Sequence, residues 1–452
     1  MHVQSESQLR PRRKFLLVTI GSHGDVHPFV GLGAKLRDRG HDVTLMASAR
    51  FESLARNERL NFTPFGTVEE YHELTKNPDL WHPRKGPAAV FGSVLDTLEL
   101  VYRPIEAFAR DNPDVTLIGS SLAWGARCAQ EKFDLPMATV HLSPSIFRSS
   151  IEPPKLSGLF MPKWLPLWVR RATWAFGDKF VIDPMIAPRL NVFRATIGLP
   201  PVKHVLRDWW NSPDLIIGMF PEWFGRDPGD WWSQTKLTGF PLYDERGVEP
   251  MPEKLEAFLN GGDKPIAFTP GSAMRFGESF FAAAVDACQQ LNRRGVLLTR
   301  HPEQVPSNLP SNVIHVDYAP FSELLPRCAA SVHHGGIGST AQALRAGVPQ
   351  LIMTLAHDQF DNGQRVQRLG VGDVVSRGQV NGRTVAAKLR GLLEDSAVNA
   401  ACRAVAKRFN GIDGLTQTCE LVEHLATRRA ATLAPRDGAA FSTRQTDPAT
   451  FR

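Results

Sequence analysis

The sequence of 452 residues predicts an α/β protein with two Rossmann-like domains, each built on a parallel sheet. Short apolar runs alternate with helical patterns from residue 15 onward, as in chains of βα units. A segment rich in Gly, Pro and charge interrupts this alternation at 238–252, and all ten tryptophans lie before it, between Trp81 and Trp232. At roughly 150 residues per domain, the length suggests two or three domains.

The apolar runs give the expected order of strands. In the first half, helical stretches such as 29–38 and 123–133 separate candidate strands at 15–20, 42–47, 115–119, 137–141 and 214–218. In the second half, the candidate strands lie near 265–269, 295–299, 312–316, 329–333, 349–355 and 371–375. We therefore expect one domain over 15–240 and another over 241–427, and packing of the last helix on the first domain is left open.

The positive charge belongs to the two ends of the chain. Residues 1–14 carry four basic and one acidic residue, and residues 428–452 carry five and two, so each end contributes +3 to the net charge of +6. Both ends are expected to be disordered. A nucleic-acid-binding domain carries a basic stripe on its folded surface, so no nucleic-acid partner is expected. Weak contact of the ends with anionic lipid is left open.

Cysteine usage and apolar segments indicate the compartment. The five cysteines are odd in number and lack metal-like spacing, which is typical of reduced thiols in a cytosolic protein. The apolar run after the basic N-terminus is too short for a signal peptide, and no segment approaches 18 uninterrupted apolar residues. A cytoplasmic protein is expected, with peripheral contact at the inner face of the membrane as the alternative.

The glycine-rich turn at 332–340 is the strongest motif. It joins an apolar strand to a helical stretch, and backbone N–H groups at the start of a helix bind diphosphates. The hydroxyls of Ser339 and Thr340 add donors, and His334 offers a further donor or a positive charge. The competing interpretation is a dinucleotide-binding turn, because 336–341 fits GxGxxA and Asp358 follows about 20 residues later. A turn with a purely structural role is the third interpretation.

A second motif follows the first strand, where open α/β sheets place their ligands. His23, Asp25 and His27 alternate in the segment 21–28, so an extended backbone would point all three to one side. Asp25 is the candidate general base, with His23 or His27 as support or as alternative bases. The structural alternative is that Asp25 only caps a helix beginning near Pro28.

The segment 156–176 is dense in aromatic side chains. Trp164, Trp168 and Trp174 lie there beside Lys163, Arg170 and Arg171. An ordinary core or lid helix is the first interpretation. A lipophilic acceptor pocket or an interfacial helix is the second.

Taken together, these motifs resemble those of family 1 glycosyltransferases. The glycine-rich turn, 346–349 and 357–362 are similar to the donor-binding signature of that family, and the likeness runs over roughly 15–425. Within the family, the sequence is most similar to the rhamnosyltransferases of rhamnolipid synthesis and to bacterial sterol and antibiotic glycosyltransferases. The resemblance implies the GT-B fold, with two parallel sheets facing each other across a cleft.

The resemblance also implies residue roles. Asp25 corresponds to the catalytic base, Tyr318 to the residue that stacks on the nucleotide base, and Asp358 and Gln359 to sugar-binding residues. Gln342 stands where plant members have a ribose-binding glutamate, which leaves UDP and dTDP open. The full expected donor set is Ser272, Tyr318, His334, Gly336, Gly338, Ser339, Thr340, Gln342, Asp358 and Gln359.

The sequence therefore predicts an inverting glycosyltransferase that moves a hexose, rhamnose or glucose, from a nucleotide sugar to a hydroxyl of a lipophilic acceptor. The acceptor is expected to be hydroxy-fatty-acid-like, sterol-like or polyketide-like. No cofactor or metal is expected, since the chain has no DxD motif. An NAD(P)-dependent oxidoreductase and a non-catalytic glycosyltransferase-like partner subunit are the alternatives.

Overall fold

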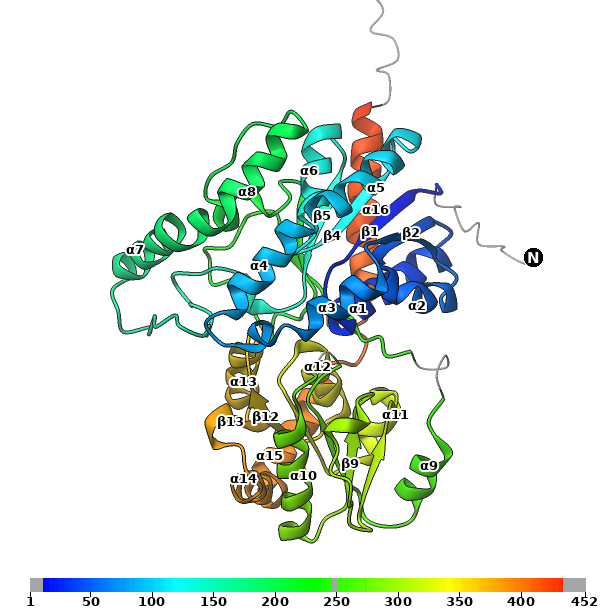
Figure 1. Ribbon diagram of the computed structural model, residues 1–452, viewed down its shortest axis with the longest axis vertical. Helices are drawn as coiled ribbons and strands as arrows, with labels where there is room; N and C mark the ends of the chain where they lie inside the picture. The colour runs from blue at the N-terminus through cyan, green and yellow to red at the C-terminus, as the bar shows by residue number, and fades with distance from the viewer. Residues whose placement is uncertain (1–10, 246–249, 273, 434–452) are drawn as a thin grey trace, which may run out of the picture.

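The computed structural model describes residues 11–245, 250–272 and 274–433. It contains two domains stacked along the long axis of the molecule, with the N-terminal domain uppermost in Figure 1. The first domain holds a seven-stranded parallel sheet in the order β3-β2-β1-β4-β5-β6-β7. Its strands are β1 (Lys14–Val18), β2 (Asp42–Ser48), β3 (Asn61–Phe65), β4 (Thr116–Ser120), β5 (Met137–His141), β6 (Leu215–Gly218) and β7 (Thr235–Leu237).

The second domain repeats this topology with a six-stranded parallel sheet in the order β10-β9-β8-β11-β12-β13. Its strands are β8 (Ile266–Thr269), β9 (Gly295–Leu298), β10 (Val313–Val316), β11 (Ala330–His333), β12 (Gln350–Thr354) and β13 (Gly372–Ser376). In both sheets the strand order reverses beside the first strand, between β1 and β4 and between β8 and β11. Such a switch point opens a crevice at the carboxyl ends of the strands.

Helices cover both faces of each sheet. In the first domain they are α1 (His23–Asp38), α2 (Glu52–Asn57), α3 (Val68–Lys76), α4 (Gly86–Asp96), α5 (Leu98–Asp111), α6 (Trp124–Phe133), α7 (Leu167–Gly177) and α8 (Asp183–Thr196). In the second they are α9 (Glu253–Asn260), α10 (Glu278–Leu291), α11 (Phe321–Leu324), α12 (Ile337–Ala346), α13 (Gln359–Arg368), α14 (Gly382–Glu394) and α15 (Ser396–Lys407); α16 (Gly414–Leu433) follows them in the chain.

The predicted fold is confirmed. Every predicted strand is present, with its ends shifted by no more than two residues. Sequence analysis missed β3 and β7, which are the two edge strands of the first sheet and have mostly exposed or half-buried residues. Edge strands need no continuous apolar run, and β3 also contains Pro64, a residue that sheets accept at their edges.

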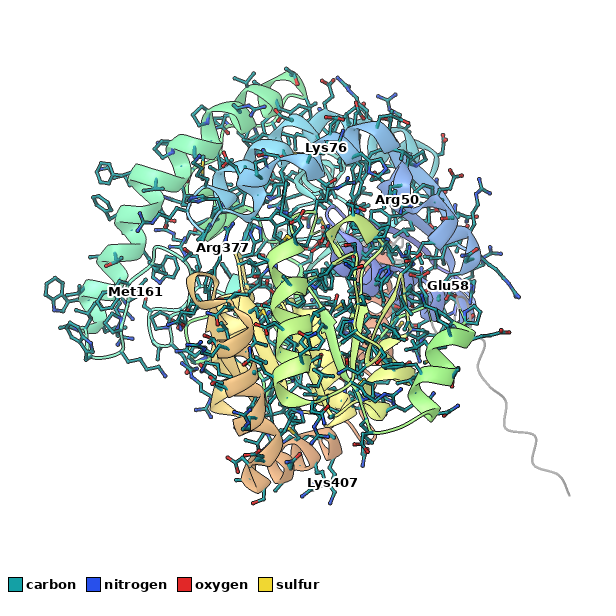
Figure 2. All side chains as sticks on the ribbon, turned by 60° about the horizontal axis from the view of Figure 1, so that its bottom comes forward. Arg50, Glu58, Lys76, Met161, Arg377 and Lys407 are labelled. Atoms are coloured by element: carbon teal, nitrogen blue, oxygen red, sulfur yellow. The ribbon has the colours of Figure 1, made fainter. Side chains whose placement is uncertain are left out.

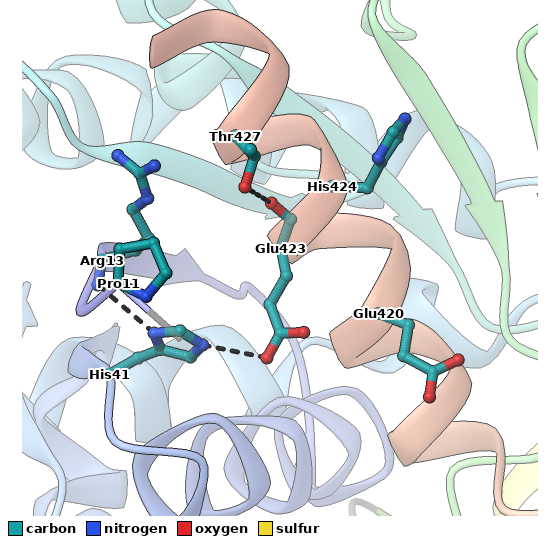
Figure 3. Close-up of a pocket in the computed structure, with 7 residues that line it drawn as sticks. All are labelled: Pro11, Arg13, His41, Glu420, Glu423, His424 and Thr427. Atoms are coloured by element: carbon teal, nitrogen blue, oxygen red, sulfur yellow. Dashed lines mark hydrogen bonds and ion pairs between the residues drawn. The ribbon is translucent and has the colours of Figure 1, made fainter. Parts of the chain in front are cut away.

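The last helix, α16, returns to the first domain. Leu415, Cys419 and Val422 belong to the same hydrophobic core as the strands β1 and β2. In the middle of the helix, the Glu423 carboxylate accepts hydrogen bonds from Arg39 Nε and Nη2 at 2.6 and 2.7 Å. The same carboxylate lies 2.9 Å from His41 Nε2 (Figure 3). The first domain is therefore completed by the C-terminal end of the described chain.

The two ends of the chain were expected to be disordered. Most of both ends, residues 1–10 and 434–452, lies outside the described residues. The prediction of disorder from 428 is wrong for the first few residues, because α16 continues to Leu433. The continuation is rich in Ala, Arg and Leu, which have high helix propensity even without an apolar face.

The chain crosses between the domains twice, and the two crossings touch. Gly239 in the first crossing and Gly414 in the second approach so closely that a Cβ on Gly414 would lie 2.2 Å from the Gly239 carbonyl oxygen. Beyond this point the Tyr243 hydroxyl donates to Glu58 in the first domain at 2.9 Å. Asp244 accepts the Ser322 N–H in the second domain at 2.7 Å. The connection is thus fastened to both domains.

We predict that Gly414→Ala destabilises the protein strongly. The new methyl group meets backbone rather than a flexible side chain, so one of the two crossings must shift, at a cost of about 2 to 4 kcal/mol in the free energy of unfolding. Urea denaturation measures this cost. The matched control is Gly391→Ala in α14, where the Cβ meets nothing and helix propensity favours Ala. Equal stability of the two variants would contradict the close crossing.

Candidate active site between the two sheets

The candidate site residues follow the carboxyl ends of neighbouring strands. Asp25 follows β1 in the first domain. In the second domain the candidates follow five adjacent strands: Tyr318 follows β10, Arg300 follows β9, Ser272 follows β8, His334 follows β11 and Asp358 follows β12. Asp25 lies close enough to Asp358 and His357 of the second domain to interact with them electrostatically.

Asp25 is positioned by the first turn of α1. It is the third helical residue, and its Oδ2 accepts hydrogen bonds from the Ser22 backbone N–H at 2.7 Å and the Ser22 hydroxyl at 3.1 Å. This is a capping box, so Asp25 does cap the helix. Gly21, with φ of +135°, lies directly beneath the carboxylate, and a Cβ there would be 2.2 Å from Oδ2. Only glycine fits that position.

The environment makes Asp25 a stronger base than an exposed aspartate. Burial raises the pKa of Asp25, the two Ser22 hydrogen bonds act in the opposite direction, and the neighbouring Asp358 raises the pKa further. No hydrogen-bond partner from the described residues occupies its second oxygen, Oδ1. A carboxylate with a raised pKa and one free oxygen suits a general base that accepts the proton of a hydroxyl.

The arrangement of His23, Asp25 and His27 differs from the one expected, and their support of Asp25 stays a prediction. Sequence analysis assumed an extended backbone, but residues 23–38 form a helix, so the side chains at 23, 25 and 27 diverge. His23 and His27, one turn apart, contact each other with ring centroids 5.5 Å apart. His27 Nε2 lies 2.9 Å from the Glu245 carboxylate. The direct partner of Asp25 is Ser22, not a histidine.

The two histidines of the glycine-rich turn have different roles. His333 is fully buried; its Nδ1 accepts the Gly335 N–H at 3.0 Å and its Nε2 lies 2.9 Å from the Gln350 amide oxygen. Burial lowers the pKa of His333 to about 4. His333 therefore holds the turn in place as a neutral ring.

His334 packs its ring beside the loop that follows β8. Its ring is enclosed by two glycines, because a Cβ on Gly271 or Gly336 would lie 2.7 or 2.4 Å from ring atoms. Burial, followed by His333 and His357, lowers the pKa of His334 to about 3, and its Nδ1 has no partner among the described residues. Of the two roles expected from the sequence, the ring as described suits a neutral donor and not a positive charge.

The turn leads into α12, whose first turn provides the anion-binding groups. Gly336 is the N-cap, and the backbone N–H groups of the residues after it precede the first intrahelical hydrogen bond, from Thr340 to Gly336. Gly338 is exposed, and a Cβ there would meet nothing within 4 Å. Ser339 is half-buried beside it.

Thr340 and Gln342 are more buried than their place in the predicted donor site implied. Thr340 is fully buried, and its hydroxyl donates to the Gly336 carbonyl oxygen at 3.0 Å. In this arrangement the hydroxyl supports the helix start, and its role in donor binding stays a prediction. Gln342 is also largely buried, on the same face of α12 as Gly338.

The segment 357–362 forms the opposite side of the turn. Burial raises the pKa of Asp358 to about 6, against the hydrogen bond that Asn362 Nδ2 donates to it at 2.8 Å. The same Nδ2 donates to the Gly335 carbonyl oxygen at 2.9 Å. Gln359 is buried, and its amide oxygen accepts the N–H groups of Leu355 and Ala356, so only its nitrogen is left for a ligand.

Contacts across the cleft join this segment to the first domain. The Ser143 hydroxyl donates to Asn362 Oδ1 at 3.2 Å, and the Lys155 N–H donates to Asp361 at 2.9 Å. His357 adopts a φ of +58° and packs its ring edge against Trp81 at 5.9 Å. Asn362 and His357 were part of the motif quoted from the sequence, but their spacing alone did not indicate a bridging role.

The remaining expected residues follow β8 and β10. Ser272 is exposed in the loop after β8. The Tyr318 hydroxyl donates to the Asp244 carbonyl oxygen, and the guanidinium of Arg300 lies 5.1 Å from the centroid of its ring. Arg300, which sequence analysis did not select, places a cation beside Tyr318. Its only sequence signal is its position directly after a predicted strand.

The described residues contain no group of three His, Cys, Asp or Glu side chains arranged to hold a metal ion. Among the same residues, no helix is long and apolar enough to cross a membrane. The five cysteines are all buried and none forms a disulfide with another.

Both halves of the chain match models of known families. Residues 15–151 match the glycosyltransferase family 28 N-terminal domain, and residues 286–412 match the erythromycin biosynthesis protein CIII-like C-terminal domain. An O-mycaminosyltylonolide 6-deoxyallosyltransferase from Streptomyces fradiae is 30% identical over 93% of this chain and 100% of its own length. A sterol 3-beta-glucosyltransferase from Arabidopsis thaliana is 26% identical over 81% of this chain and 58% of its own length.

Solved structures agree on the fold. The glycosyltransferase of kitacinnamycin aligns with a TM-score of 0.71 at 19% identity, covering 92% of this chain and 99% of its own. The calicheamicin glycosyltransferase CalG4 aligns with a TM-score of 0.67 at 19% identity over 93% and 100% of the two chains. VinC, solved in complex with dTDP, aligns with a TM-score of 0.66 at 21% identity over 92% and 100%. The likeness to all three supports the GT-B fold that the sequence predicts.

We predict that burial of His333 makes the protein less stable in mild acid. A histidine with a pKa of about 6.5 when unfolded and about 4 when folded binds more protons in the unfolded state, so its stabilising effect is complete above pH 6.5 and lost as the pH falls towards 4. Between pH 7 and pH 5 this histidine accounts for about 2 kcal/mol in the free energy of unfolding.

Urea denaturation of the wild type and of His333→Asn at both pH values measures this effect. The variant is less stable at pH 7 because it loses the contacts with Gly335 and Gln350, but it should lose about 2 kcal/mol less on acidification. An identical pH dependence of the two proteins would show that His333 is not held neutral.

Proposed function

The chain belongs to the family 1 glycosyltransferases, and we propose that it moves a hexose from a nucleotide-diphosphate sugar to a hydroxyl of a lipophilic acceptor. That it is a glycosyltransferase using a nucleotide sugar follows from the family. Membership of this family argues against the two alternatives, an NAD(P)-dependent oxidoreductase and a non-catalytic partner subunit. We propose in addition that the sugar is a hexose, that the acceptor is lipophilic, that the reaction inverts the configuration and that it needs no metal ion.

The observation that carries the proposal is the carboxylate of Asp25, which is held by Ser22 and interacts electrostatically with Asp358 of the second domain. In the first step, an acceptor hydroxyl binds at the free oxygen of Asp25. The carboxylate takes the hydroxyl proton while the oxygen forms a bond to the anomeric carbon of the sugar. The bond from that carbon to the diphosphate oxygen breaks on the opposite face, so the configuration inverts.

The leaving diphosphate needs stabilisation that the start of α12 supplies. The unpaired N–H groups after Gly336 and the positive end of the helix dipole favour a negative charge there. Ser339 and the neutral His334 add hydrogen-bond donors. These groups are fixed before the reaction and need no metal ion to offset the charge that develops on the diphosphate.

Asp358 is suited to bind a sugar hydroxyl. Its pKa of about 6 leaves it mostly ionised at neutral pH, and Asn362 fixes one of its oxygens. An ionised acceptor gives strong hydrogen bonds to hydroxyl donors. Because Asp358 lies near Asp25, a sugar held by Asp358 lies next to the proposed base.

The choice of sugar and acceptor is supported by the relatives. One is named as a 6-deoxyallosyltransferase acting on O-mycaminosyltylonolide and another as a sterol glucosyltransferase, so rhamnose or glucose and a lipophilic, hydroxy-fatty-acid-like, sterol-like or polyketide-like acceptor are proposed here. VinC was solved with dTDP, and the spinosyn rhamnosyltransferase SpnG was solved with thymidine diphosphate. Gln342, in place of the ribose-binding glutamate of plant members, leaves UDP as the second choice. The narrower resemblance to the rhamnosyltransferases of rhamnolipid synthesis stays a prediction.

We predict that Asp25→Asn abolishes transfer and keeps nucleotide binding. The amide cannot take the acceptor proton, so turnover should fall by about 100-fold or more. Sugar transfer to a hydrophobic alcohol, followed by mass spectrometry with dTDP- and UDP-sugars, measures turnover, and calorimetry with dTDP and UDP measures binding. Full turnover of the variant would overturn the mechanism.

Two glycines beside Asp25 provide a matched pair of variants for the same test. Gly21→Ala places a Cβ on the carboxylate and should reduce turnover nearly as much as Asp25→Asn. Gly24→Ala, whose Cβ would lie 3.6 Å from the Ser22 hydroxyl in ordinary contact, should stay active. Equal activity of the two alanine variants would show that the placement of Asp25 does not matter.

We predict that Gly338→Ala weakens nucleotide binding without weakening the fold. The alanine Cβ would have no protein atom within 4 Å, so a loss of nucleotide affinity would indicate that the nucleotide binds at the start of α12. Calorimetry should show about tenfold weaker binding of dTDP or UDP, which is about 1.4 kcal/mol. Gly391→Ala in α14 is the control for a helical glycine with open space. Unchanged affinity of Gly338→Ala would place the diphosphate elsewhere.

A further inference from the structure

A set of aromatic side chains stands exposed on the segment before α7, on α7 itself and on the turn that follows it. Its members are Phe160, Trp164, Trp168, Phe176 and Phe180, with exposed fractions of 78%, 74%, 72%, 61% and 57%. We call these five residues the aromatic stripe. The helix projects from the side of the first domain in Figure 1, and aromatic rings extend from it into solvent in Figure 2.

The spacing of the stripe follows the helix. Trp168, Phe176 and Phe180 are separated by multiples of four residues along α7 and the π-turn Asp178–Ile182, so they lie on one face. Ala172, which completes the row, is also exposed. A surface helix normally presents its apolar row to the core, whereas this one presents it to solvent.

The stripe is not needed to hold the helix in place. The inner face does this, because Arg148 donates to both carboxylate oxygens of Asp178 at 2.7 and 2.9 Å and lies over the ring of Trp174 at 4.5 Å. The Trp174 indole N–H also donates to the Ser149 carbonyl oxygen at 3.1 Å. Since the helix is anchored from behind, its exposed aromatic row is available to another partner.

Basic residues accompany the stripe. Residues 155–182 contain five Lys or Arg and one acidic residue, Asp178, which is buried against Arg148. Lys163 is paired with Glu152 at 2.8 Å. Arg171 and Lys179 are exposed beside the stripe, and no carboxylate of the described residues pairs with either. The local surface is therefore aromatic and cationic.

We propose that the aromatic stripe is a membrane-docking surface, which inserts its rings among the headgroups of a bilayer that contains anionic lipid. Tryptophan and phenylalanine side chains favour the interface between headgroups and acyl chains, and each neighbouring Lys or Arg adds attraction to an anionic surface. A contact between two copies of the chain is opposed by charge, since a symmetric interface would bring Arg171 and Lys179 towards their own copies.

This proposal does not depend on the proposed acceptor. It rests on the exposed residues of α7 and its neighbours, and a chain with Asp25→Asn should dock equally well. A lipophilic acceptor would reach such an enzyme from the bilayer, so docking and transfer would occur at the same surface. The two proposals can fail separately.

Co-sedimentation of the full chain with vesicles tests the docking surface. Wild-type protein should sediment with phosphatidylcholine vesicles that contain about 30% phosphatidylglycerol, and only weakly with phosphatidylcholine alone. Trp168→Ser with Phe176→Ser should lower the partition coefficient about tenfold or more, since both rings leave the interface. Absence of binding by the wild type to the anionic vesicles overturns the proposal.

Matched charge reversals separate the stripe from the basic ends of the chain. Arg171→Glu with Lys179→Glu should weaken binding about tenfold or more, whereas Arg383→Glu with Arg390→Glu, exposed on α14 and of equal charge change, should have little effect. If both pairs bind alike, or if the aromatic variants lose a dimer in sedimentation equilibrium while lipid binding is unchanged, the stripe is not a membrane surface. Unchanged thermal unfolding of the variants confirms that they are folded.

Discussion

Burial of ionisable groups between the two sheets is the constraint on which the site depends. Burial raises the pKa of Asp25 and of Asp358, which disfavours their ionised form. Burial lowers the pKa of His334 and of His357, which disfavours their protonated form. Each shift has the same cause, since facing carboxyl edges remove water from both sides of the cleft. The shifts in turn set the chemistry: a more basic carboxylate on one domain faces neutral donors on the other.

The glycines near these groups follow from the same crowding. Gly21 leaves room for the carboxylate of Asp25, and Gly271 and Gly336 enclose the ring of His334. In each case the polar side chain lies where the Cβ of another residue would be. The glycine-rich character of the turn is thus partly a matter of packing a histidine, in addition to exposing backbone N–H groups.

Much of the fold and part of the site could be predicted from the sequence, for identifiable reasons. Buried parallel strands are continuous apolar runs, so their positions were clear, whereas the edge strands β3 and β7 lack such runs. Asp25 and His334 were selected because they lie in short motifs. The orientation of His27 towards Glu245 and the burial of Thr340 depend on contacts over many residues, and no local pattern carries that information.

The returning helix α16 determines where related enzymes can be recombined. Because α16 completes the core of the first domain, the last residues of the second domain precede Gly414, and the chain then continues into the first domain. A chimera that takes its donor half from a relative should therefore exchange an internal segment, from about Gly239 to about Asp413, and keep the parental C-terminal helix. Both junctions then fall where the two crossings touch. A poor fit between the joined segments at that place would destabilise both domains.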